Sequence, residues 1–180
     1  AELMGWSPFV GLQLRYSLID RTAERDLIPM ARAMDMAITP WSILGAGTLT
    51  GKYSRGASPA EGRAKEGAAT VARNLAIADA VVEVAEEIGC TPSQVAVSWV
   101  RQQHGVIVPL IGARNLAQLK DNLGALDVTL DDAQLEKLGE VSRFEPGFPH
   151  DFLESEHIRD IVFGGTYDRI DNHRARHPGA

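Results

Sequence analysis

The stretch VIVPLIGARNLAQLKDN, residues 106–122, combines the pattern of a buried strand with that of an anion-binding helix. Its apolar run ends at Gly112, and the cation Arg114 follows two residues later. A helix is expected from Asn115, with polar side chains recurring one turn apart. Because backbone N–H groups and the helix dipole favour negative charge at a helix N-terminus, this layout predicts a site for a phosphorylated ligand.

A second stretch, TPWSILGAGTLTGKY at 39–53, repeats this organisation. An apolar run leads into a loop of small and polar residues, and the single cation Lys52 follows. Small residues allow backbone N–H groups to approach a phosphate closely. Two such loops in one chain favour one dinucleotide bound along the rim of a β/α sheet.

Composition limits the possible classes of protein. The chain has 180 residues, 44% of them hydrophobic, which suits one ordinary core. A net charge of −6 and a pI of about 5.3, without a dense basic patch, argue against nucleic acid as the main partner. No apolar run reaches the roughly 18 residues of a membrane span, and no signal peptide is visible.

The single cysteine, Cys90, excludes an intrachain disulfide framework and fits a reducing compartment, so a cytoplasmic location is expected. No histidine lies near it in the sequence. We therefore expect an inert, half-buried thiol rather than a nucleophile.

Hydrophobic periodicity predicts alternating strands and helices. Strands are expected at 9–14, 36–41 and 106–111, and helices at 22–35, 71–88, 92–103, 115–125 and 130–142. Such alternation implies parallel strands with helices outside, and the mostly apolar strands suit a sheet that is buried on both faces.

Prolines and capping residues refine these boundaries. Thr91 as N-cap, followed by proline at the first helical position, predicts a well-defined helix start. Thr129 is expected to open the last of the helices. Pro29 is tolerated if its helix begins near Asp26, whereas Pro109 removes one ladder hydrogen bond and makes the third strand less regular.

Three parallel strands alone leave two edges with unpaired backbone groups, which favours self-association. A complete (β/α)₈ barrel needs about 250 residues. We therefore expect the chain to be the last part of a larger structure. It begins at Ala1 without a methionine, so the natural start is expected upstream.

Four stretches together resemble the C-terminal half of an aldo-keto reductase. They are GLQLRYSLIDRTAERDLIPMARAM at 11–34, ITPWSILGAGTLTGKY at 38–53, VPLIGARNLAQLKDNL at 108–123 and GFPHDFL at 147–153. The similarity runs from about Trp6 to His173. It implies a (β/α)₈ barrel that binds NADPH at its C-terminal face, where both phosphate-type loops would lie after strands seven and eight.

The fold expected from this resemblance is α/β, the C-terminal portion of a (β/α)₈ TIM barrel. It would contain about three parallel strands with flanking helices, an extra C-terminal helix and a tail. Residues 1–144 would form the partial barrel with the NADP-binding loops, and 145–180 the tail. The tail would either cover part of the substrate pocket or pack across the outside of the barrel.

The matching stretches do not include the family's catalytic residues. The family's tetrad of aspartate, tyrosine, lysine and histidine lies in the first half of the barrel, whose segments are absent here. The tyrosines Tyr16, Tyr53 and Tyr167, the lysine Lys52 and the five histidines do not match those positions. We assign no catalytic residue and no metal site in this chain.

The resemblance gives Gln13 and Trp41 roles at the nicotinamide. The Gln13 amide would bond the carboxamide, and the Trp41 ring would stack on the nicotinamide and position it. The alternatives are a buried amide satisfied by backbone and a core tryptophan.

Pyrophosphate binding would fall to the loop after Trp41. The implied residues are Ser42, Ile43, Leu44, Gly45, Ala46 and Lys52. A plain turn with a solvated lysine is the alternative. Arg63 matches a family arginine on the adenosine side of the cofactor.

The adenosine end would be bound by Gly112, Arg114, Gln118, Asp121 and Asn122. The planar guanidinium of Arg114 suits a 2′-phosphate, so NADP(H) is expected rather than NAD(H). Gln118 and Asn122 could reach the adenine or its ribose phosphate. Gln118 also stands three residues after Asn115, as in a capping box, and both roles are compatible.

The residues Arg15, Tyr16 and Arg21 either line a substrate mouth or are structural, and we favour the structural interpretation. The expected function is that of a fragment of an NADP(H)-dependent oxidoreductase that reduces aldehydes or ketones to alcohols. The isolated chain would supply cofactor binding and be inactive. Alternatives are a non-catalytic nicotinamide-cofactor-binding regulatory module, or a half-barrel that assembles with itself or a partner.

Overall fold

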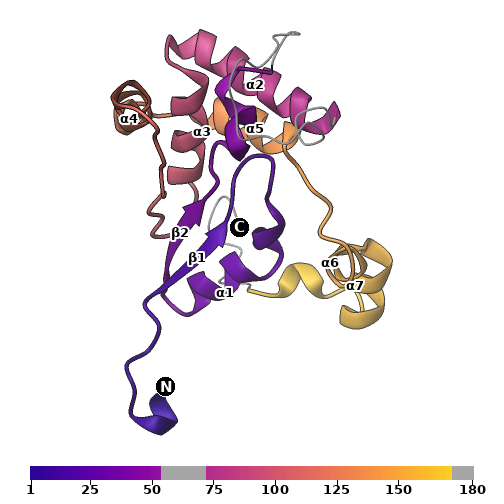
Figure 1. The fold of residues 1–180 in the computed structure, drawn as a ribbon. Helices are drawn as coiled ribbons and strands as arrows, with labels where there is room; N and C mark the ends of the chain where they lie inside the picture. The colour runs from indigo at the N-terminus through magenta and orange to yellow at the C-terminus, as the bar shows by residue number, and fades with distance from the viewer. Residues whose placement is uncertain (54–71, 172–180) are drawn as a thin grey trace. The chain divides into compact units, whose positions relative to one another are not determined.

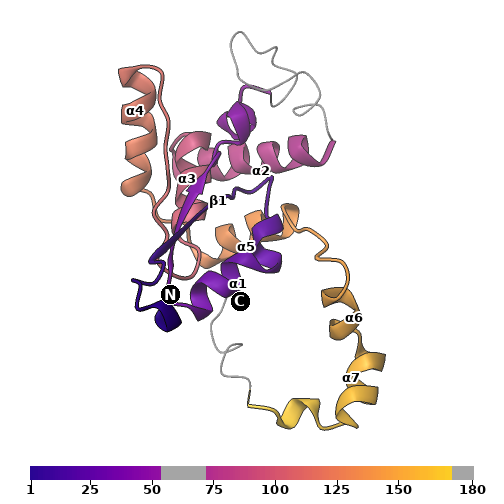
Figure 2. The same ribbon diagram turned by 60° about the horizontal axis from the view of Figure 1, so that its bottom comes forward.

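The computed structural model describes residues 1–53 and 72–171. The chain divides into two compact units, Ala1–Arg143 and Phe144–Ala180. The first unit holds a small parallel sheet with helices around it, and the second holds short helices (Figures 1 and 2).

The described part of the first unit has two strands, each followed by helical elements. In order its elements are η1 (Glu2–Met4), β1 (Gly11–Arg15), η2 (Thr22–Arg25), α1 (Leu27–Ala33), β2 (Ala37–Trp41), η3 (Gly45–Thr50), α2 (Ala72–Ile88), α3 (Pro92–Arg101), α4 (Leu116–Leu123), η5 (Gly124–Leu126) and α5 (Asp132–Val141). The strands β1 and β2 pair in parallel, from Gly11 opposite Ala37 to Arg15 opposite Trp41.

The prediction of a third regular strand at 106–111 is wrong. This segment lies beside β2, where Val108 N donates to Ile38 O at 2.8 Å and Leu110 N to Pro40 O at 2.8 Å, but it forms only one bridge, Ile38 with Ile107. The next ladder bond would need an N–H from Pro40, which has none. Pro109 takes the alternate position, whose N–H would point away from β2, so it breaks no bond to that strand.

Helix starts follow the local capping chemistry. Asp26 caps α1, its side chain accepting from Leu27 N, so Pro29 lies in the tolerated first turn as predicted. The capping box of Thr91 with Gln94 is confirmed at the start of α3. The expected start of α5 at Thr129 is wrong, because Asp131 forms the capping box instead.

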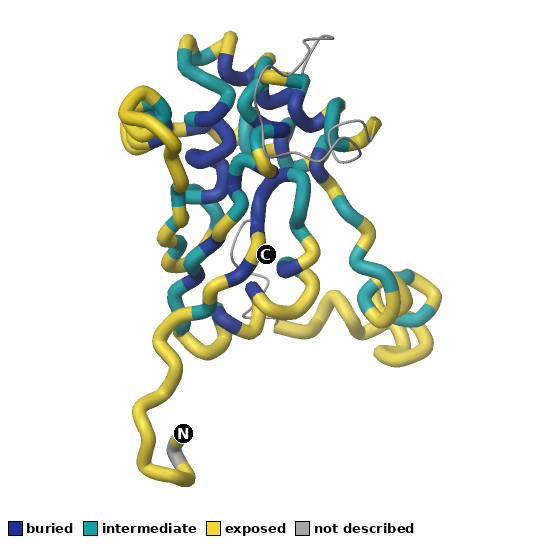
Figure 3. Tube along the Cα trace, in the orientation of Figure 1, coloured by how far each residue is buried: buried dark blue, intermediate teal, exposed yellow. Residues whose placement is uncertain are grey.

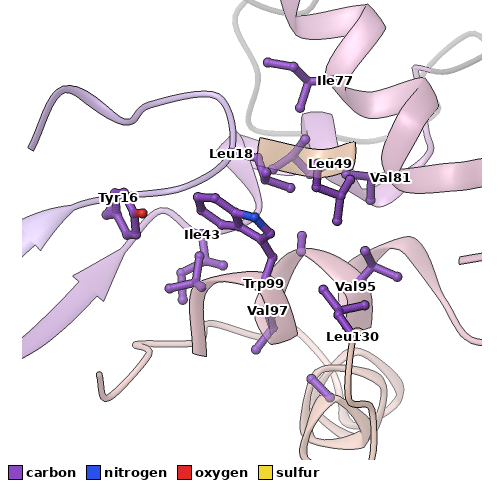
Figure 4. Packing of buried hydrophobic residues seen from close by; sticks show 14 of the residues in the cluster. Tyr16, Leu18, Ile43, Leu49, Ile77, Val81, Val95, Val97, Trp99 and Leu130 are labelled. Atoms are coloured by element: carbon purple, nitrogen blue, oxygen red, sulfur yellow. The ribbon is translucent and has the colours of Figure 1, made fainter. Parts of the chain in front are cut away.

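One hydrophobic cluster lies between the sheet and the helices (Figures 3 and 4). Trp99 of α3 is only 2% exposed and packs against Tyr16, with 5.6 Å between the ring centroids. Helix α2 packs on α3 and α5 and presents Ile77, Val81 and Val84 to this core.

A polar network crosses the edge of the core. Glu24 accepts from Tyr16 Oη at 2.6 Å, and it accepts twice from Arg21, at 2.7 and 2.9 Å. Arg21 also donates to Gly139 O and to Ser142 Oγ of the α5 end, and its guanidinium covers the Trp99 ring at 5.3 Å. These contacts give Tyr16 and Arg21 structural roles, as favoured from the sequence.

Alkaline pH should destabilise the first unit through Tyr16. Burial, and then the Glu24 carboxylate, raise the pKa of Tyr16 above its ordinary value of 10.0. Because the folded state keeps this proton more tightly, its stabilisation is complete below the ordinary pKa and is lost as pH rises above it. Urea denaturation from pH 8 to 11 should show the free energy of unfolding falling by up to about 1.4 kcal/mol per pH unit above pH 10.

The variant Tyr16→Phe should lose this pH dependence, although it will be less stable at pH 8. Tyr167→Phe, in the second unit, is the control and should keep the wild-type profile. Parallel declines in wild type and Tyr16→Phe would show that Tyr16 is not the group responsible.

The second unit has helical elements but no buried core residue among those described. It contains α6 (His150–Glu154), α7 (Glu156–Phe163) and η6 (Tyr167–Arg169). Aromatic pairs hold it locally, with 5.9 Å between the rings of Phe148 and Phe152. Among the described helices of both units, none is long and apolar enough to cross a membrane.

Candidate cofactor-binding site

A cleft of about 670 Å³ lies where the loop after β2 meets the segment that leads into α4. The two loops singled out in the sequence therefore converge on one cavity. The sequence-predicted residues that line it are Trp41, Ser42, Ile43, Leu44, Ala46, Lys52, Gly112, Arg114, Gln118, Asp121 and Asn122. Both loops follow the carboxyl ends of neighbouring parallel segments, which is where α/β barrels place their ligand sites.

The loop after β2 has an unusual backbone. Ser42 and Ala46 take left-handed φ values of 60° and 55°, and Gly45 and Gly47 take 55° and 98°. Turns of this kind are typical of anion-binding backbone surfaces. Here Gly45 N and Gly47 N donate to Ser42 O and Leu44 O within the turns, each at 2.9 Å. Gly45 does not itself line the cleft, because its Cα faces the side chain of Ile19.

Replacing Gly45 by alanine should destabilise the protein by about 1–3 kcal/mol, because a left-handed φ adds strain and a new Cβ would displace the end of the Ile19 side chain. The matched control is Gly47→Ala. Gly47 also has a positive φ, but a Cβ there meets no atom within 4 Å. Its loss should be about 1–2 kcal/mol by chemical denaturation. Equal losses in both variants would show that Ile19 does not restrict this loop.

The start of α4 differs slightly from a capping box. Asn115 Oδ1 accepts from Gln118 N at 2.9 Å, as expected of an N-cap. The Gln118 side chain, however, accepts from Arg114 N at 2.8 Å, one residue before the N-cap. Arg114 is exposed, and across residues 1–53 and 72–171 its guanidinium enters no ion pair. A cation that is not paired within this part of the chain therefore stands at the helix N-terminus.

The other two polar residues of α4 are partly engaged within the protein. Asn122 is only 4% exposed and donates to Gly112 O across 3.4 Å. Asp121 Oδ1 accepts from Thr91 Oγ1 at 2.7 Å and from Gln94 Nε2 at 3.3 Å. Asp121 thus fastens α4 to the capping box of α3.

The structure brings Trp41 to the cleft but not Gln13. The Trp41 side chain is 44% exposed, so it is not a core tryptophan. Gln13 pairs in register with Thr39 and is exposed, so the interpretation as a buried amide is wrong. Arg63 lies outside the described residues.

Further residues line the cleft that sequence reasoning missed. They are Gly47, Thr50, Ser93, Leu110, Ile111 and Ala113. Most of them flank the predicted residues within the same two loops, which was the available signal. Ser93 had none, because the first turn of α3 reaches the cleft only through tertiary packing.

Neither a reactive thiol nor a metal cluster accompanies the cleft in the described part of the chain. Burial, and then the charge of Asp121, raise the pKa of the Cys90 thiol above its usual range. The thiolate is therefore disfavoured near neutral pH, in line with an inert cysteine. Among the described residues, no group of histidine, cysteine and carboxylate side chains could hold a metal ion.

Comparison with known proteins places the chain in a family. The profile of the Aldo/keto reductase family matches residues 1–143. A probable aryl-alcohol dehydrogenase of Saccharomyces cerevisiae is 34% identical over 83% of this chain and 47% of its own length. An aryl-alcohol dehydrogenase [NADP(+)] of Phanerodontia chrysosporium is 31% identical over 99% of this chain and 49% of its own. An uncharacterized oxidoreductase of Bacillus subtilis is 32% identical over 74% of this chain and 41% of its own.

The chain thus spans about half the length of the curated relatives that it matches. The family fold is the (β/α)₈ barrel, and the structure described here is α/β with a small parallel sheet. On the match to the family profile over residues 1–143, the chain belongs to the Aldo/keto reductase family.

Proposed function

We propose that this chain binds NADP(H) in the cleft and forms the C-terminal half of a (β/α)₈ carbonyl reductase. The observation that carries the proposal is the convergence of both phosphate-type loops on one cavity of about 670 Å³, with Lys52 and Arg114 among its lining residues. Two cations and a concave backbone suit a ligand with more than one phosphate.

The lining residues divide by chemistry along the cleft. Trp41 offers an aromatic surface for the nicotinamide, and the loop of Ser42 and Leu44 offers backbone groups for the pyrophosphate. Arg114, exposed beside the start of α4, suits a 2′-phosphate because its guanidinium can donate two parallel hydrogen bonds. Asn122 stands next to Gly112 and adds an amide at the adenosine end.

The proposed cofactor-binding residues also include Gln13 and Arg63. Gln13 lies on β1 outside the described cleft, so its contact with the carboxamide would require the neighbouring strand of a complete barrel.

Asp121 already accepts hydrogen bonds from α3. We therefore propose that Asp121 acts mainly by holding α4 in place.

In the complete protein the reduced cofactor would supply a hydride to an aldehyde or ketone carbonyl. The proton would come from a tyrosine of the family tetrad, which we place outside these 180 residues. Two relatives, one named a probable aryl-alcohol dehydrogenase and one an aryl-alcohol dehydrogenase, favour aromatic aldehydes among carbonyl substrates. This chain's own task is to bind and orient the cofactor.

Titration of the purified chain with NADPH and then NADH tests the binding proposal. NADPH should quench tryptophan fluorescence through Trp41 and bind more tightly than NADH. Subsequent addition of benzaldehyde should leave NADPH absorbance unchanged. Absence of NADPH binding would refute the proposal for this chain, and NADPH oxidation would refute its inactivity.

An alternative is a half-barrel that completes its sheet by assembly. The observation that favours it is the apolar segment beside β2, whose Val106 and Val108 are 63% and 51% exposed. Such exposed edges are pairing sites. Cofactor binding that depends on chain concentration, together with a dimer in sedimentation experiments, would support self-assembly. Binding by a monomer that stays inactive beside a supplied N-terminal half would instead indicate a regulatory module.

A further inference from the structure

The Trp41 ring is held by a charged neighbour on the adjacent strand. Arg15 is the register partner of Trp41, and its guanidinium lies over the indole at 6.0 Å from the ring centroid. Tyr16 N donates to Trp41 O at 3.3 Å, which ties the backbones together at this point. The end of β1 therefore sets the surroundings of the ring that lines the cleft.

Arg15, whose side chain is 51% exposed, in turn pairs with an acidic residue. Its Nε lies 2.9 Å from Asp20 Oδ2. Asp20 closes a tight turn in which Ser17 N donates to Asp20 O and Asp20 N donates to Ser17 O, each at 3.0 Å. The next residue, Arg21, is anchored to Glu24 and to the end of α5. A chain of contacts thus connects the rigid core network to the position of Trp41.

A partly exposed indole needs such support to keep one orientation. Trp41 is 44% exposed, so packing restricts its side chain only in part. A guanidinium over one face of an aromatic ring is attracted by the ring quadrupole and leaves the opposite face available. Stacking on a ring that is already oriented loses less conformational entropy than stacking on a mobile one.

We propose that Arg15, held by Asp20, is a positioning residue that orients the Trp41 indole for stacking on the nicotinamide. This inference rests on the proposed function for the nicotinamide contact. The orientation of Trp41 itself does not depend on the cofactor. The two parts can therefore be tested separately.

The orientation is tested by ¹⁹F NMR of the full chain labelled with 5-fluorotryptophan. The chain contains only Trp6, Trp41 and Trp99, and Trp41→Phe identifies the resonance of interest. In Arg15→Met, which keeps an unbranched apolar side chain, this resonance should move toward that of free fluorotryptophan while the Trp99 resonance stays in place. Arg15→Lys, which keeps a cation over the ring, should restore most of the wild-type shift.

Asp20→Asn provides a second variant that leaves Arg15 itself intact. It removes the charge partner but keeps the backbone bonds of the turn, and it should displace the Trp41 resonance in the same direction. The control is Arg143→Met, whose ion pair is with Glu140 and whose loss should leave the resonance unchanged. A Trp41 resonance at the wild-type position in both Arg15→Met and Asp20→Asn overturns the proposal.

Cofactor affinity supplies the second measurement. The Kd for NADPH should rise about two- to fivefold in Arg15→Met, corresponding to the loss of one exposed cation–π contact, and stay unchanged in Arg143→Met. An unchanged Kd in Arg15→Met would overturn the role in stacking. If the wild-type chain binds no NADPH, the proposed function fails, and the NMR shifts still decide whether Arg15 orients Trp41.

Discussion

Replacing Arg114 by glutamate should weaken NADPH binding by about 10- to 100-fold, because a charge-assisted pair of hydrogen bonds is replaced by repulsion. NADH, which has no 2′-phosphate, should lose less than about threefold. The measurement is the Kd of each cofactor by fluorescence titration at constant ionic strength. Since Arg114 is exposed, the loss should shrink as salt rises.

The matched control is Arg143→Glu, which makes the same charge change on a side chain that is 77% exposed and absent from the cleft lining. It should change both dissociation constants little. Equal losses for NADPH and NADH in Arg114→Glu would exclude a contact with the 2′-phosphate, and the preference for NADP(H) would lose its physical basis.

Replacing Glu24 by alanine should lower the free energy of unfolding by about 2–4 kcal/mol. The carboxylate accepts from Tyr16 Oη and twice from Arg21. Its removal leaves a guanidinium that is only 16% exposed without its counter-ion. We expect less than the full penalty of a buried pair, because the Glu24 side chain is 25% exposed and partly screened.

This loss should lower the Tm by about 5–15 °C, measured by calorimetry, if the first unit unfolds cooperatively. Glu24→Gln is the control, because an amide oxygen can still accept one of these hydrogen bonds without the charge, and its loss should be smaller. A Glu24→Ala variant within about 0.5 kcal/mol of wild type would contradict a supporting role for this network.

Most helix starts could be predicted from the capping residues next to them in the sequence. Thr91 and Gln94 satisfy each other's backbone groups within four residues, so the start of α3 could be predicted without tertiary information. Asp26 determines where Pro29 is tolerated in the same way. The α5 start was misplaced because Thr129 and Asp131 are both good N-caps, and only the structure shows that Asp131 is the one used.

The third strand shows why pairing is harder to predict. Pro109 was the visible breaker in its own segment, yet the missing ladder bond belongs to Pro40 on the neighbouring strand. Which proline faces which neighbour depends on register, and register is a long-range property. The alternation of N–H directions along a strand allows Pro109 on one side and penalises Pro40 on the other.

In the candidate site too, some features could be predicted from the sequence and others needed the structure. The two phosphate-type loops were recognisable from small residues and cations at short spacing. Their convergence on one cleft, the entry of Ser93 and the engagement of Asp121 by Thr91 came from tertiary packing. Asp121 in particular could not be separated from Asn122 by spacing alone, although one is held by α3 and the other bonds Gly112.

The sequence by itself determined the first two strands with the helices that follow them, most helix starts and the two loops that suit a dinucleotide. These depend on residues within a few positions of one another, where backbone hydrogen bonds and small side chains act locally. The tertiary structure alone decided that Trp41 faces the cleft beside Arg15 and that Gln13 does not line it. Those positions depend on how β1 pairs with β2 and how α3 packs on α4, and such contacts join residues that are far apart in the chain.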